Sequence, residues 1–120
     1  MALGKLDQWE DAILAYDEAL KLKPDYHDAW YNRGIDLAKL GRFYEAIDSF
    51  NKVLEIKPDN PHAFYNKACC YAAKHNVDLA VQSLEKAINL NPDEYRKKAR
   101  AFADFDSIRN DARFQALMQE

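Results

Sequence analysis

The sequence has few of the residues that interrupt regular structure. Its 120 residues include three glycines and four prolines, while 48% are hydrophobic and 31% are charged. So few glycines exclude a glycine-rich loop that cradles phosphate groups. Because glycine and proline are both scarce, the composition favours helices over turns. The length fits one domain or a short array of repeats, with enough apolar residues for a core.

Long hydrophobic runs and an excess of basic residues are also missing. No apolar stretch approaches the roughly 20 residues that span a bilayer, and Met1–Lys5 lacks the apolar core of a secretory signal. We therefore expect no membrane partner. The formal net charge of −3 also argues against a nucleic-acid partner, because a bulk electrostatic grip on phosphates needs a basic face.

Cysteine is scarce as well, and Cys69 and Cys70 are neighbours. Successive helical residues point about 100° apart, which disfavours a disulfide between them and makes a reducing, cytoplasmic setting the expected one. The histidines and cysteines lack the spacing of metal ligands. No nucleophile stands beside a base, so we expect no catalytic residue, no metal and no cofactor, and predict that the protein is not an enzyme.

A repeat is what the sequence does contain. Small, aromatic and proline positions recur three times at a spacing of 34 residues. Two of the matching sets are Ala12, Ala46 and Ala80, and Pro24, Pro58 and Pro92. A fixed period of this length is typical of stacked helical hairpins, each of which buries its apolar face against a neighbour. The predicted fold is therefore all-α, with about seven helices.

Turn residues predict where these helices begin and end. Met1–Leu6 is interpreted as the tail of an incomplete first helix, and Asp7 as the N-cap of a helix that stops before Pro24. The second hairpin is predicted at 27–40 and 43–57, with Gly41 in its turn.

The third hairpin begins with Asn60 as its cap and Pro61 at the first helical position, and it ends at Pro92. Asn76 is expected either to adopt left-handed geometry or to cap the following helix. After Pro92 the period decays, and we interpret residues 95–120 as capping helices. Four residues are predicted to cover the exposed flank of the third hairpin: Phe102, Phe105, Ile108 and Phe114.

These positions resemble the tetratricopeptide repeat. The best match is residues 27–60, and it depends on Trp30, Gly34, Leu37, Gly41, Phe43, Ala46, Phe50 and Pro58. Residues 61–94 match with one exception, Leu84 in place of an aromatic, and residues 1–26 match as a truncated first repeat. The resemblance implies an array over 1–94 that forms a right-handed superhelical solenoid, followed by the cap at 95–120. It also implies a protein-interaction module that binds an extended peptide or a partner helix in a concave groove.

The first helix of each hairpin lines the groove in arrays of this kind. Ten residues are carried over as groove residues: Tyr31, Asn32, Ile35, Lys39, His62, Tyr65, Asn66, Cys69, Arg96 and Arg100. Amides repeated along a groove can bond the backbone of an extended peptide. The alternative is that Asn32 and Asn66 bond only to neighbouring turns and that the tyrosines pack between helices.

Some members of the family hold the C-terminal carboxylate of a peptide in a clamp of Lys, Asn and Arg. Asn66, Arg96 and Arg100 match three of its five positions, whereas Tyr31 and Ile35 do not match the other two. The sequence therefore matches the carboxylate clamp only in part.

A second hypothesis comes from the incomplete first helix, which leaves an apolar seam with an open side. Such a seam is normally covered, and the chain could form a homodimer or a swapped assembly through it. The residues predicted for this self-association are Leu3, Leu6, Trp9 and Tyr16.

Overall fold

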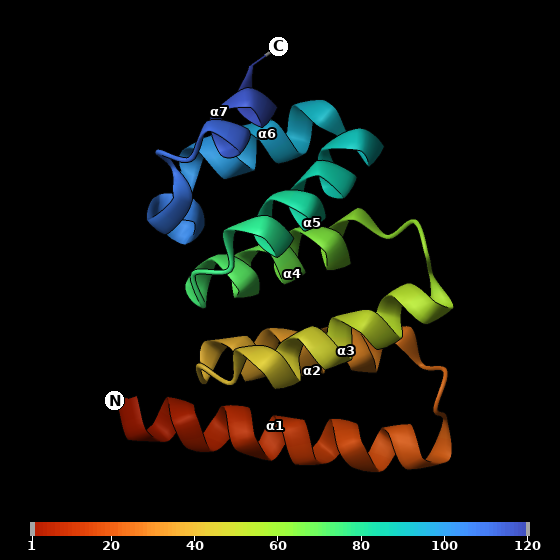
Figure 1. The fold of residues 1–120 in the computed structure, drawn as a ribbon. Coiled ribbons are helices and arrows are strands. Elements are labelled where there is room, and N and C mark those ends of the chain that lie inside the picture. The colour runs from red at the N-terminus through yellow and green to blue at the C-terminus, as the bar shows by residue number, and fades with distance from the viewer. Residues whose placement is uncertain (1, 120) are drawn as a thin grey trace. The chain divides into compact units, whose positions relative to one another are not determined.

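The computed structural model describes residues 2–119, and the side chains from residue 8 onward. Over these residues it contains helices and no strand, so the predicted all-α class is confirmed (Figure 1). The helices are α1 (Ala2–Leu22), α2 (His27–Lys39), α3 (Phe43–Ile56), α4 (Pro61–Ala73), α5 (Val77–Leu90), α6 (Pro92–Ala101), the 3₁₀ helix η1 (Ala103–Ile108) and α7 (Ala112–Met118). Among the described helices, none is long and apolar enough to cross a membrane.

The chain has two compact units, residues 1–58 and residues 59–120. In the first unit α2 packs against both α1 and α3. Gly41, with φ of 80°, turns the chain between α2 and α3 as predicted. The core of this unit consists of buried residues from all three helices: Ile13, Leu20, Ala29, Leu37, Ala46, Ile47, Phe50 and Val53.

The prediction of a turn at Asp7 is wrong, because α1 runs without interruption from Ala2 to Leu22. Asp7 is in phase with Gly41 and His75, whose φ angles of 80° and 59° reverse the chain in the other two copies. Asp7 has a Cβ atom, which makes a positive φ costlier for it than for Gly41. Continued i→i+4 hydrogen bonding is then favoured over a left-handed turn that aspartate adopts at a cost.

Close approach of α2 and α3 depends on Gly34. A Cβ atom at this position lies 2.7 Å from Cε1 of Phe50, well inside van der Waals contact. The Phe50 ring is fully buried, so it has little room to move away. The small residue that the repeat pattern requires at this place therefore has a steric reason in this chain.

We expect Gly34→Ala to lower the free energy of unfolding by about 1–3 kcal/mol, because the methyl group overpacks the crossing. This loss outweighs the gain of about 0.8–1.0 kcal/mol that alanine has over glycine inside a helix. Urea unfolding followed by far-UV circular dichroism measures it.

Gly41→Ala is the control, since its Cβ meets nothing within 4 Å and its cost of about 1–2 kcal/mol comes from the positive φ. In a Phe50→Leu background the cost of Gly34→Ala should shrink and that of Gly41→Ala should stay. Equal costs of Gly34→Ala in both backgrounds would contradict the steric account.

The second unit begins with the hairpin of α4 and α5. The Asn60 side chain accepts hydrogen bonds from the amides of His62 and Ala63, with Pro61 in the first turn, as predicted. Of the two roles expected for Asn76, the structure shows the capping role. Its side chain accepts a hydrogen bond from the amide of Leu79. These caps satisfy amide groups that have no partner inside the helix.

The residues after Pro92 pack onto this hairpin within the same unit. Phe105, Ile108 and Phe114 are buried as predicted, in one core with residues of α4, α5 and α6. The prediction for Phe102 is wrong, because its side chain is 51% exposed. Phe102 ends α6 in an extended conformation with ψ of 149°, and the 3₁₀ helix that follows directs Phe105 into the core instead.

Candidate functional site

One face of α2 carries the four groove residues expected in the first unit. Tyr31, Ile35 and Lys39 are spaced by four residues and Asn32 lies next to them, so the helix brings them together. Asn32 and Lys39 are exposed, and Tyr31 and Ile35 are half-buried. The Tyr31 ring meets the ring of Phe50 edge-on at 5.8 Å, which fixes its position. This face therefore offers an amide, an aliphatic side chain and an amine to a ligand.

The described residues expected for self-association lie beside α2. The ammonium group of Lys39 is 5.8 Å from the ring centroid of Trp9, which is half-buried. Tyr16 is also half-buried, and burial together with the Asp36 carboxylate raises the pKa of Tyr16. Leu3 and Leu6 belong to α1, but their side chains lie outside the described residues. The seam at Trp9 and Tyr16 is thus partly covered within one chain.

The corresponding face of α4 has His62 and Asn66. The Nδ1 atom of His62 lies 2.7 Å from the hydroxyl oxygen of Tyr95, and the two rings meet edge-on. The Asn66 amide donates to the carbonyl oxygen of His62 at 2.8 Å, a bond to the neighbouring turn that the sequence left open as an alternative.

Tyr65 and Cys69 lie deeper than the other groove residues of α4. Tyr65 is 7% exposed, and its ring packs against Tyr95 and Phe105 with centroid separations of 5.3 and 5.6 Å. The Tyr65 hydroxyl is buried close to the Cys69 thiol but makes no hydrogen bond of normal geometry, and burial raises the pKa of Tyr65. Cys69 is half-buried against the same core. Tyr65 therefore packs between helices, which is the alternative that the sequence left open for the tyrosines.

Arg96 and Arg100 contact the end of α7. The Nε atom of Arg96 donates to the carbonyl oxygen of Leu117 at 2.8 Å, and Arg100 donates to that of Met118. Both carbonyls belong to the last turn of a helix, where they have no intrahelical partner and where cations are favourable. The two arginines therefore cap α7. The sequence could not show this, because it depends on α7 folding back along α6.

Arg33 is a residue that sequence reasoning missed. Its guanidinium donates to the Asp17 carboxylate of α1 and to the Ser49 hydroxyl of α3, both at 2.7 Å, so it connects three helices. The available signal was a serine at a buried position of the repeat, Ser49, with Ser83 in phase. Among the described residues there is no group of three or more His, Cys, Asp or Glu that could hold a metal ion.

Two helical hairpins in phase at 34 residues, each with small residues at its crossing, define a helical-repeat protein. Family models confirm this class. The tetratricopeptide repeat models match residues 27–60 and 61–94, and a TPR repeat model matches residues 2–41. The chain belongs to the tetratricopeptide repeat family. No curated protein sequence matches it.

Solved structures of the same fold are also similar. YrrB, described as a TPR protein with an unusual peptide-binding site, is 34% identical over 83% of this chain and 52% of its own, with a TM-score of 0.72. MamA is 31% identical over 78% of this chain and 53% of its own, with a TM-score of 0.69. The chain thus spans about half the length of these two structures. The TPR2B domain of yeast Sti1, solved in complex with pHsp70, is 29% identical over 84% of this chain and 82% of its own, with a TM-score of 0.71.

Proposed function

We propose that this protein binds an extended peptide or a partner helix of another protein on the equivalent faces of α2 and α4, without catalysis, and that it does so in the cytoplasm. Its family and its similarity to YrrB and to Sti1 TPR2B support a protein-interaction scaffold. The observation that carries the finer proposal is the α2 face, where exposed Asn32 and Lys39 flank the half-buried Ile35. An amide beside an apolar side chain suits a ligand that offers both backbone and side-chain contacts.

The α4 face contributes His62 and Asn66 to the proposal, while Tyr65 and Cys69 support that face from below. Arg96 and Arg100 can contact a ligand only if the ligand replaces the carbonyl oxygens of Leu117 and Met118 as their hydrogen-bond acceptors. A carboxylate clamp that uses these arginines is therefore not part of the proposal. Self-association through α1 has less support than peptide binding, because α2 already covers part of Trp9 and Tyr16.

The test begins with a phage-displayed library of random peptides selected on the wild-type chain, and the selected peptide is then titrated against variants. We expect Asn32→Ala or Asn66→Ala to raise the dissociation constant at least about tenfold, which corresponds to about 1.4 kcal/mol. Far-UV circular dichroism checks that each variant is folded.

Asn89→Ala is the matched control, because Asn89 is an exposed asparagine on α5 and lies outside the faces proposed for binding. It should change the dissociation constant by less than about twofold, within the range expected for a neutral contact. Selected peptides that bind all three variants as tightly as the wild type would overturn the proposal. Failure to select any peptide would also count against it.

A further inference from the structure

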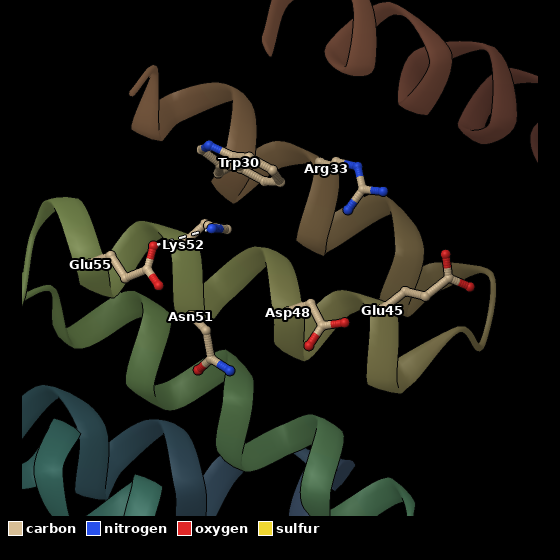
Figure 2. A pocket seen from close by; sticks show the side chains of 7 residues that line it. All are labelled: Trp30, Arg33, Glu45, Asp48, Asn51, Lys52 and Glu55. Atoms are coloured by element: carbon tan, nitrogen blue, oxygen red, sulfur yellow. Dashed lines mark ion pairs between the residues drawn. The ribbon is translucent and has the colours of Figure 1, made fainter. Parts of the chain in front are cut away.

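A second surface of the first unit is a hollow of about 530 Å³ between α2 and α3. Figure 2 shows its side chains, two from α2 and five from α3: Trp30, Arg33, Glu45, Asp48, Asn51, Lys52 and Glu55. On α2, each residue turns about 100° from the last, so Trp30 and Arg33 point away from Ile35 and Lys39. The hollow is therefore separate from the face proposed above for peptide binding.

Ion pairs neutralise most charges of the hollow. Lys52 pairs with Glu55 at 3.4 Å, Arg42 with Glu45 at 2.6 Å and Arg33 with Asp17 at 2.7 Å. Asp48 is left exposed on α3, and no described cation lies within ion-pair distance of its carboxylate. The hollow thus carries one negative charge that no ion pair of the described residues balances.

The Trp30 ring lines the same hollow (Figure 2). The indole N–H of Trp30 donates to the carbonyl oxygen of Pro24 at 2.8 Å, which fixes the ring, and the Arg33 guanidinium lies 5.7 Å from the ring centroid. Aromatic faces attract cations, and the alkyl stems of lysine and arginine pack well on such rings. The combination of a fixed indole and an unbalanced carboxylate suits a cationic side chain.

The third hairpin has the same positions without the acidic residues, so its contacts can be compared with those of the second hairpin. Gln82 and Asn89 replace Asp48 and Glu55 in phase, and Phe64 replaces Trp30. Without an acidic residue at 89, Lys86 lies with its ammonium group 5.4 Å from the Phe64 ring centroid. In the second hairpin Lys52, the counterpart of Lys86, pairs with Glu55 instead. The third hairpin thus places Lys86 on its aromatic ring, whereas in the second hairpin Arg33 lies on the Trp30 ring and Lys52 pairs with Glu55.

We propose that the hollow at Trp30 and Asp48 binds a lysine or arginine side chain of a partner protein, with its cation on the Asp48 carboxylate and its stem on the indole. An adjoining hollow of about 220 Å³ shares Arg33 and adds the carboxylates of Glu10 and Asp17 and the guanidinium of Arg42. It also places Leu14, which is 63% exposed, along the same edge. The partner segment that fits has a lysine or arginine for the first hollow and an apolar side chain that can reach Leu14 beside it.

Oligolysine and oligoglutamate peptides of equal length are the probes, and the Trp30 indole N–H signal in a ¹H–¹⁵N spectrum is the readout. A Trp9→Phe variant assigns this signal, since the chain has two tryptophans. We expect oligolysine, and not oligoglutamate, to shift the Trp30 signal in a saturable and salt-sensitive way. Absence of a shift at Trp30 would overturn the proposal.

Asp48→Asn should weaken oligolysine binding at least about fivefold, whereas Asp93→Asn, which removes the same charge from an exposed position on α6, should leave it within about twofold. Equal effects of the two variants would show only a general attraction to an acidic protein and would overturn the site. Trp30→Phe, the residue type of the third hairpin, should keep the fold and weaken binding, which is followed by the backbone amide signals of Asn51 and Lys52 because the indole signal is lost. Asn32→Ala should leave oligolysine binding unchanged, so failure here and failure of the peptide-binding proposal are distinguishable.

Discussion

Replacing Phe105 by alanine should lower the free energy of unfolding by about 3–5 kcal/mol, the range for deleting a fully buried phenylalanine ring. The Phe105 side chain is 0% exposed, and its ring lies 5.6 Å from that of Tyr65 and 5.7 Å from that of Phe114. The Phe105 ring therefore joins α4 to α7. Its removal leaves a cavity between these two helices and η1. Urea unfolding followed by circular dichroism measures the loss.

The matched control is Phe102→Ala, three residues away and of the same type. The Phe102 side chain is 51% exposed, so its removal should cost less than about 1 kcal/mol. Similar losses for both variants would show that the 3₁₀ helix does not direct Phe105 inward as described.

Alkylation of Cys70 by iodoacetamide at pH 8 should be at least about 10³-fold slower in the folded protein than in urea. Burial, with a smaller contribution from the Asp104 carboxylate, raises the pKa of the Cys70 thiol from 9.0 to about 12. At pH 8 this lowers the reactive thiolate fraction by about three powers of ten, because the thiolate is the nucleophile. The side chain is also only 2% exposed.

A Cys69→Ser variant isolates this rate, and the rate should keep rising about tenfold per pH unit from pH 8 to pH 10 as the thiolate fraction increases. For Cys69, burial raises the pKa in the same direction, so Cys70→Ala should also leave a slowly reacting thiol. Alkylation of the folded protein within about tenfold of the rate in urea would contradict a closed core in the second unit.

The repeat period predicted the helices well, because their limits depend on nearby residues. Asn60, Pro61 and Asn76 act on amides within three positions, so their roles follow from sequence alone. The turn expected at Asp7 depended instead on tertiary packing, and α1 continues through that position. A periodic pattern cannot show whether a neighbour is present.

The candidate site was predicted less completely, for a related reason. Spacing placed Tyr31, Asn32, Ile35 and Lys39 on one face of α2, and the structure places them there as well. Spacing could not show that α7 folds back so that Arg96 and Arg100 cap it, or that Tyr65 packs against Phe105. These contacts join residues from separate elements, and no local pattern encodes them.

Chemical-shift mapping of the wild-type chain with a selected peptide tests the central claim most directly. The account predicts that the largest amide shifts fall on the exposed faces of α2 and α4, at Asn32, Ile35, Lys39, His62 and Asn66. Shifts confined to α3, α5 or α7 would contradict it.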